Sequence, residues 1–314
     1  MIDVVKIREL TLEQASSAGR QPFLSAASGL VCIGGQAYVV ADDELHLGQF
    51  NLDTAEPGQL LRLFEGELPG DKRERKALKP DFEVLIWLPP QADATQFNYP
   101  YGALLALGSG SKPNRCSGVL LSVNAQGAIN GEPQRLPLQN LYAALAVHVD
   151  DLNIEGAVVS GDTLFLMQRG SKGSRCNALL SLPLAELRTL LRDPAHEIHI
   201  ARHNIQSFEL GEIEGVPYSF TDGAALPNGD FLYTAVAENT DDSYRDGACL
   251  GAVIGVASLD GTVKWQQPLA QPHKVEGVSV RVEGESLQVL LVTDADDPSV
   301  PALLLSAQID NWQR

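Results

Sequence analysis

Short apolar runs separated by turn residues recur along the whole chain and predict an all-β structure. The runs are rich in Val, Leu and Ile and are bounded by Gly, Asn, Asp and Pro, which is typical of antiparallel strands. Asn228-Gly229 and Gly34-Gly35 stand between consecutive runs and predict tight hairpin turns. The 28 glycines and 18 prolines are spread along the sequence rather than gathered in a linker, so we expect a single domain over residues 1–314.

The strands form an internal repeat. Its clearest copies are residues 110–116 (GSKPNRC) and 170–176 (GSKGSRC), and each precedes an apolar strand that contains Leu-Leu-Ser. Extension from this pair gives five units, each with a first strand that opens on a small or acidic residue. These openings are Ser28-Gly29, Glu83-Val84, Glu155-Gly156, Asp222-Gly223 and Glu276-Gly277. Small antiparallel sheets repeated about an axis make a β-propeller. We therefore predict five blades, or six if the long unit between Glu83 and Glu155 hides another sheet.

The two ends of the chain are expected to complete one blade together. The last unit shows only three strands, whereas residues 4–10 have strand character and no unit of their own. We predict that this N-terminal strand is the outer strand of the last blade, which leaves no free edge where the ring closes. Fourth strands are also expected at residues 197–200 and 263–266. Segments 138–147 and 184–191 have a helical pattern and are expected to decorate the ring.

Alternating strand direction gathers the charged residues on one face. The start of each innermost strand lies on the same face as the loop between the second and third strands, because antiparallel neighbours alternate in direction. The strand openings give that face an inner ring made of Ser28, Glu83, Glu155, Asp222 and Glu276. The loops add further charged side chains: Asp42, Asp43, Lys112, Arg115, Arg169, Lys172, Arg175, Glu238, Arg245, Asp294, Asp296 and Asp297.

The ring carboxyls are expected to repel one another. Two like charges 4 Å apart cost about 1 kcal/mol in water and several times that where solvent is scarce. Three arrangements relieve the repulsion: protonation with raised pKa values, neutralisation by nearby lysines and arginines, or a hard cation such as Ca²⁺ among the oxygens. The candidate metal ligands are accordingly Glu83, Glu155, Asp222 and Glu276. The alternative is that these acids accept backbone N–H bonds from the next blade.

The basic residues of the same face suggest an anion site. A lysine and the fork of an arginine suit a phosphate or a carboxylate, so a small anionic molecule is an expected ligand. The candidate ligand-binding residues are Lys112, Arg115, Arg169, Lys172, Arg175 and Arg245. The repeated Gly-Ser-Lys-x-x-Arg segment has another interpretation, a loop anchored by an Arg–carboxylate pair between neighbouring blades.

The net charge of −17 and the pI of about 4.7 limit the possible partners. A field of this sign repels phosphate backbones and anionic membrane surfaces, so nucleic acid and membrane are not expected partners. The sequence has no run of apolar residues long enough to span a membrane and no secretory pattern at its start. We therefore expect a cytoplasmic protein with reduced cysteines. Cys116 and Cys176, at equivalent positions of two blades, are expected to lie too far apart for a disulfide.

Two segments resemble known propeller families. The openings Ile154-Glu155-Gly156 and Val275-Glu276-Gly277, with LVTDADD at residues 291–297, resemble an uncharacterised bacterial β-propeller family that is similar to the esterase-like phytase domains. Residues 221–233 resemble the Asp-Gly strand pair of gluconolactonase-type calcium propellers. These resemblances imply a metal-assisted hydrolase of esters, lactones or phosphoesters. The asparagine ligands of the calcium lactonases are not evident at the ring positions.

Two functions remain open for the charged face. The first is a hydrolase in which Glu155, Glu276 and His273 are catalytic and a central Ca²⁺ activates water. The second is a propeller without enzymatic activity that binds a small anionic ligand or a protein partner there. His196 and His199 do not have the spacing of a zinc protease motif and are expected in an outer strand.

Overall fold

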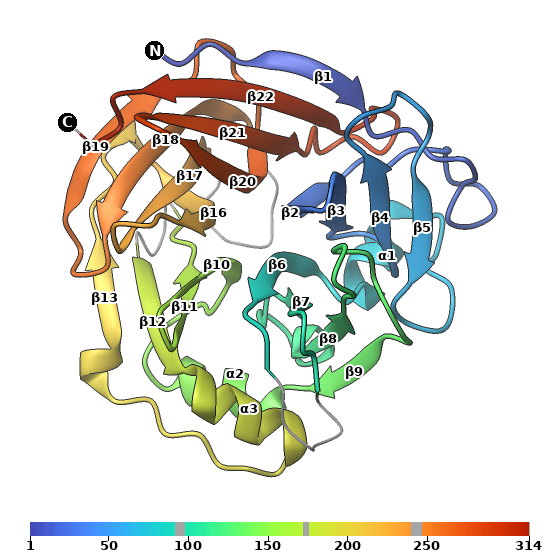
Figure 1. The fold of residues 1–314 in the computed structure, drawn as a ribbon, viewed down its shortest axis with the longest axis horizontal. Helices are drawn as coiled ribbons and strands as arrows, with labels where there is room; N and C mark the ends of the chain where they lie inside the picture. Colours follow the sequence, from blue (N-terminus) through green and yellow to red (C-terminus); the bar gives the residue numbers. More distant parts are fainter. Residues whose placement is uncertain (92–97, 172–175, 240–246, 314) are drawn as a thin grey trace.

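The computed structural model describes residues 1–91, 98–171, 176–239 and 247–313, which form five four-stranded antiparallel sheets in a ring (Figure 1). Each sheet is a blade whose first strand lies nearest the centre. Blade 1 contains β2 (Ala27–Ile33), β3 (Gln36–Ala41), β4 (His46–Asn51) and β5 (Gln59–Arg62). Blade 2 contains β6 (Phe82–Leu88), β7 (Ala103–Gly108), β8 (Ser117–Ser122) and β9 (Gln134–Pro137).

The other three blades follow the same plan. Blade 3 contains β10 (Ile154–Ser160), β11 (Thr163–Gln168), β12 (Asn177–Pro183) and β13 (Ile205–Phe208). Blade 4 contains β16 (Ser219–Ala225), β17 (Asp230–Glu238), β18 (Cys249–Ser258) and β19 (Val263–Pro268), and the short hairpin of β14 (Glu212–Ile213) and β15 (Val216–Pro217) precedes it. Blade 5 contains β20 (Val275–Glu283), β21 (Ser286–Thr293), β22 (Leu303–Asp310) and β1 (Val5–Glu9).

The N-terminal strand closes the ring as predicted. β1 pairs antiparallel with β22, with Val5 opposite Ser306 and Glu9 opposite Leu303, and Figure 1 shows the first and last strands of the chain side by side. The five-bladed fold is confirmed. The six-bladed alternative is wrong, because the described residues between blades 1 and 3 form one four-stranded sheet, two α-helices and a 3₁₀ turn, with no further sheet.

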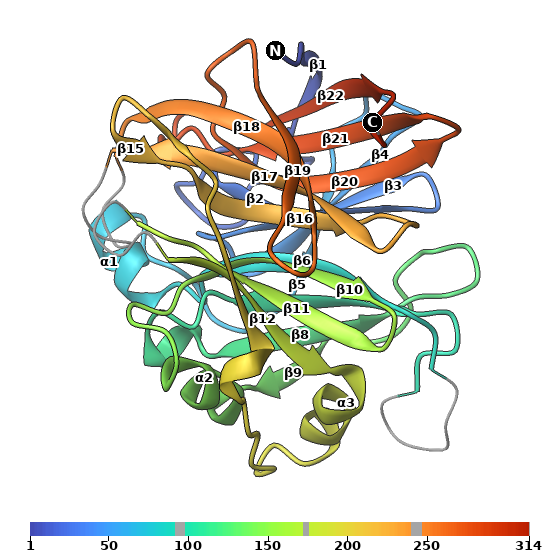
Figure 2. The ribbon, with the colours of Figure 1, turned by 90° about the vertical axis from the view of Figure 1, so that its left-hand side faces the viewer.

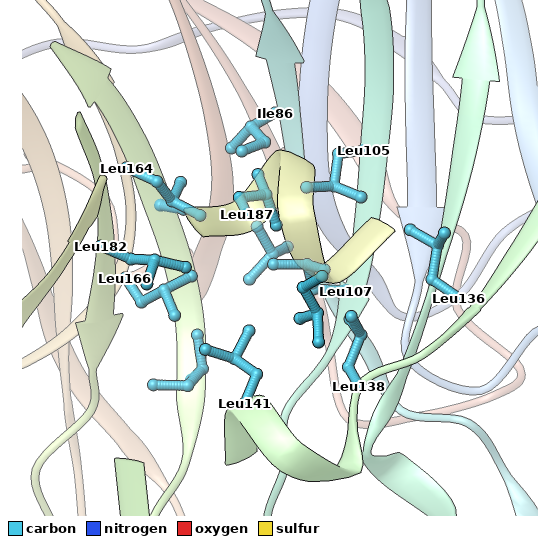
Figure 3. Packing of buried hydrophobic residues seen from close by; sticks show 14 of the residues in the cluster. Ile86, Leu105, Leu107, Leu136, Leu138, Leu141, Leu164, Leu166, Leu182 and Leu187 are labelled. Carbon is cyan, nitrogen blue, oxygen red and sulfur yellow. The ribbon is translucent and has the colours of Figure 1, made fainter. Parts of the chain in front are cut away.

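Hydrophobic clusters fill the spaces between neighbouring blades, and one of them also holds two helices. The described residues form five such clusters, one for each pair of adjacent blades. In the space between blades 2 and 3, α2 (Gln139–Ala146) and α3 (Leu184–Arg192) pack on the strands, and Figure 3 shows Leu141 and Leu187 pointing toward Leu107 and Leu166. Figure 2 shows both helices on the outer side of these sheets.

The prediction for the outer strand of blade 3 was wrong. Residues 197–200 are not in a strand, and β13 occupies that place further along the chain. His196 instead contacts Glu186 of α3 at 2.9 Å.

The helix α1 (Lys72–Leu78), which follows the N-cap residue Asp71, was not predicted, because it is short and strongly charged. No helix among the described residues is long and apolar enough to cross a membrane. All four cysteines are free thiols.

Each innermost strand carries a β-bulge close to its start. The register of pairing with the second strand skips one residue in every blade, and the skipped residues are Ser28, Glu83, Glu155, Thr221 and Glu276. A bulge turns one side chain out of the regular alternation and is often found beside functional sites. In blades 1, 2, 3 and 5 the bulge residue lines the cavity at the end of the central channel, whereas Thr221 of blade 4 is buried against Thr234.

The first strands approach one another so closely that glycine is required at the residue after the bulge in some blades. A Cβ on Gly277 would lie 2.8 Å from the backbone nitrogen of Leu30 in blade 1. We expect Gly277→Ala to lower the free energy of unfolding by about 1–3 kcal/mol, the usual cost of overpacking. Denaturant unfolding is the measurement. Gly70→Ala is the control because a Cβ there meets no atom within 4 Å, and equal stability of the two variants would contradict the prediction.

Candidate functional site

A polar cavity of about 80 Å³ opens at the end of the central channel that the bulges face. All five blades contribute to its wall through the starts of their first strands and through loops of the same face. None of the described side chains that line it is apolar. The lining residues are Ser28, Asp42, Lys76, Lys79, Asp81, Glu83, Arg115, Asn153, Glu155, Arg169, Gly170, Ser171, Ser219, Glu238, Lys274, Glu276, Asp294 and Asp296.

Lys79 is the centre of the charge cluster on the side of blades 1 and 2. Its Nζ forms ion pairs with Asp42, from the β3–β4 loop, and with Asp81 Oδ1 at 2.8 Å, although the lysine side chain is only 7% exposed. Asp81 also accepts hydrogen bonds from Ser109 Oγ at 2.5 Å and from Arg115 Nη1 at 2.6 Å. The backbone of Asp81 is in the left-handed region, with φ of 58°. The strain of that conformation is offset by three polar contacts that hold the carboxylate in place.

Arg169 joins the acids of blades 3 and 4. Its guanidinium contacts Glu155 Oε2 at 3.1 Å and Glu238 Oε2 at 2.5 Å. The other oxygen of Glu155 accepts a hydrogen bond from Asn153 Nδ2 at 2.5 Å. Both oxygens of the Glu155 carboxylate are therefore held in place by donors.

Lys274 connects blades 4 and 5. Its Nζ lies 3.1 Å from Glu238 Oε1, 3.5 Å from Glu276 Oε1, 3.9 Å from Asp294 Oδ2 and 2.8 Å from Asp296 Oδ1. An ammonium group has only three N–H donors. At least one of these four carboxyls consequently lacks a hydrogen bond of its own from Lys274. A carboxyl in that position can avoid an unpaired negative charge by keeping its proton.

The cavity contains more acids than bases. Among the described residues, eight carboxyl groups line it against five cationic side chains. Burial raises the pKa of Glu276 to about 7 and that of Asp42 to about 6, against the opposing effect of the nearby lysines. Burial also raises the pKa of Glu83 and of Asp294 well above the usual range of a carboxyl. The excess of acids is thus relieved in part by protons, the first of the three predicted arrangements, and in part by lysine and arginine, the second.

Three of the four predicted ring acids line the cavity, and the fourth does not. The bulge of blade 4 is at Thr221, so Asp222 takes the place that glycine has in blades 1, 3 and 5. Its carboxylate is buried and accepts the backbone N–H of Val278 in blade 5 at 2.9 Å. Asp222 therefore fits the alternative that the sequence left open, a carboxyl that bonds to the backbone of the next blade, and not the ring of ligands.

The predicted ligand-binding residues separate into three groups. Arg169 and Arg115 line the cavity, and both engage carboxylates of the protein. Lys112, at the start of the 3₁₀ turn η1 (Pro113–Arg115), is not among the lining residues, and neither is the half-buried His273, which was predicted to be catalytic. Lys172, Arg175 and Arg245 lie outside the described residues.

The two lysines at the centre of the charge clusters were not predicted from the sequence. Lys79 and Lys274 precede the ring acids by four and two positions, in the sequences KPDFE and KVE. Both stand before the apolar strand that was used to define the unit, so they were not assigned to the ring face. A lysine just before a strand that opens on an acid was the signal that could have found them.

These observations define the class of protein: a five-bladed β-propeller with a charged axial cavity formed by all its blades. Residues 23–309 match the family of unknown function DUF6929, and the chain belongs to that family. No curated protein sequence is significantly similar to it. The likeness to the esterase-like phytase domains and to gluconolactonases stays a prediction.

Several solved structures are similar over nearly the whole chain. They include a luciferin-regenerating enzyme (11% identity, 97% of this chain and 94% of that chain, TM-score 0.45). They also include a glutaminyl cyclase of Myxococcus xanthus (12%, 98% and 98%, TM-score 0.44). The catalytic domain of a Coprinopsis cinerea GH62 α-L-arabinofuranosidase is a third (10%, 98% and 97%, TM-score 0.49). At these values the likeness supports no statement about chemistry.

Proposed function

We propose that the axial cavity is the active site of a hydrolase that uses two ring carboxyls as acid and base. The observation that carries the proposal is the unequal environment of Glu155 and Glu276. Arg169 and Asn153 hold both oxygens of Glu155, whereas Lys274 lies 3.5 Å from Glu276 Oε1. Two carboxyls with such different hydrogen-bonding surroundings are suited to different roles in proton transfer.

The roles follow from these surroundings. Glu276, with its pKa raised to about 7 by burial, would donate a proton to the leaving group. Glu155, held in position by Arg169 and Asn153, would accept a proton from the attacking water. Arg169 and Lys274 would stabilise negative charge that develops on the substrate oxygen.

The wall of the cavity favours an uncharged polar substrate. Lys79, Arg115, Arg169 and Lys274 are all engaged by carboxylates of the protein. The surplus of carboxyls repels a phosphate, so the expected substrates are esters or lactones of polyhydroxylated molecules and not phosphoesters. His273 does not line the cavity and has no role in this mechanism.

The test is a screen of ester, lactone, glycoside and phosphoester substrates with the wild type and Glu276→Gln. We expect the variant to lose about 10²–10⁴-fold in kcat, the usual contribution of a positioned acid. Glu283→Gln is the matched control, because Glu283 ends the same strand and its side chain is 44% exposed. Full activity of Glu276→Gln would refute the assignment. Binding of a small polar molecule without turnover by the wild type would favour the second function, a propeller that only binds its ligand.

A further inference from the structure

The two clusters of acids in the cavity have the composition of cation sites, and lysine side chains occupy their centres. The resemblance to calcium propellers implies a hard cation among ring carboxyls. Such a cation takes six to eight oxygen ligands at about 2.3–2.6 Å. The residues of this chain do not fit that arrangement, because an ammonium group lies where the oxygens converge.

The first cluster combines Asp42, Asp81 and Glu83. One carboxylate oxygen of each lies within 4.8 Å of the others, close enough to share one ion. Lys79 Nζ contacts the first two acids directly and raises the ionised fraction of both by its charge. A metal ion and this ammonium cannot occupy the same place.

The second cluster surrounds Lys274. Four carboxyls from the end of β17, the start of β20 and the β21–β22 loop converge on its Nζ within 3.9 Å. The side chain is 11% exposed. Burial alone would lower the pKa of Lys274, but these acids raise it well above its usual value, so the ammonium keeps its charge.

We infer that Lys79 and Lys274 are tethered cations that replace metal ions in the ring, and that removal of either lysine opens a site for a divalent cation. A tethered ammonium neutralises one charge and is always present, whereas a metal ion neutralises two and is lost on dilution. The proposal does not depend on catalysis, since it concerns only what neutralises the carboxyls.

The experiment compares melting temperatures in 1 mM EDTA and in 5 mM CaCl₂ for the wild type, Lys274→Met and Lys264→Met. We expect the wild type to melt at the same temperature in both buffers. Lys274→Met should melt lower in EDTA and recover by about 5 °C or more in CaCl₂, as a protein does when it gains a ligand for its folded state. Lys264→Met is the control, because Lys264 also pairs with a buried aspartate, Asp230, but outside the cavity.

Each outcome decides the proposal. A wild type that calcium stabilises, or a Lys274→Met variant that responds to calcium no more than Lys264→Met, would overturn it. If Lys274→Met does not fold in EDTA, the same comparison is made by refolding it with and without CaCl₂, and with Lys79→Met as a second variant. Refolding that requires calcium supports the proposal, and failure of both variants in both buffers contradicts it.

Discussion

The melting temperature of the protein is expected to be about 2–5 °C higher at pH 5.5 than at pH 8, opposite to the trend expected where paired carboxylates dominate. The cause is the set of cavity acids whose pKa values are raised in the folded state. Burial raises the pKa of Glu276 to about 7 and that of Asp42 to about 6. It also raises the pKa values of Glu83 and Asp294 well above the usual range of a carboxyl. The folded state therefore binds more protons than the unfolded chain between about pH 4.5 and pH 7.

The sign follows from linkage. A carboxyl with a raised folded pKa contributes stability that is complete below its unfolded pKa and is lost as the pH rises through its folded pKa. One pKa unit corresponds to about 1.4 kcal/mol, and the four acids share protons, so we expect a total loss on the order of 1–3 kcal/mol across this window. Glu44 and Asp81, whose pKa values are lowered, change protonation below this window. His273, whose pKa burial lowers, acts in the opposite direction but is a single half-buried group.

Thermal unfolding followed by circular dichroism between pH 5 and pH 8.5 measures this dependence. Glu276→Gln removes one of the titrating groups and should flatten the curve between pH 6 and pH 8. Glu283→Gln should leave the curve unchanged, since that carboxyl is exposed. A wild-type melting temperature that rises from pH 5.5 to pH 8 would show that the cavity acids are ionised in the folded protein.

The architecture could be predicted from the sequence because it depends on periodic features. Short apolar runs, the repeated strand openings and an unpaired N-terminal strand are enough to derive five blades and the closure by β1. The helix α1 and the outer strand of blade 3 depend on local features instead. α1 is stabilised by the Asp71 cap and by charged contacts, and β13 follows a long loop, so neither has a hydrophobic pattern that stands out.

The ring could be predicted only in part, because its register depends on bulges. A shift of one residue moves a strand's side chains to the opposite face. In blade 4 the Asp-Gly pair of residues 222–223 resembles the Glu-Gly openings of blades 3 and 5, but the bulge lies one residue earlier, at Thr221. The position of this bulge accompanies a contact between blades, since Asp222 accepts the backbone N–H of Val278 in the next blade. The ion pairs of Lys79 and Lys274 likewise join residues of different blades.

Replacement of Arg169 by methionine is expected to cost about 3–5 kcal/mol of unfolding free energy, the usual loss when one partner of a buried ion pair is removed. The guanidinium is 12% exposed and lies between Glu155 and Glu238, whose side chains are 6% and 10% exposed. Methionine has a similar volume but leaves two buried carboxylates without their common donor.

Two comparisons separate this electrostatic loss from a loss of packing. Arg281→Met removes an arginine that is 78% exposed and pairs with Glu283, and it should change stability by less than about 0.5 kcal/mol. The double variant Arg169→Met, Glu155→Gln should recover part of the loss, because it removes one of the two carboxylates that lose the guanidinium. Denaturant unfolding at pH 7.5 gives all three values. A loss below about 1 kcal/mol for Arg169→Met, or no recovery in the double variant, would show that this pair does not hold blades 3 and 4 together through its charge.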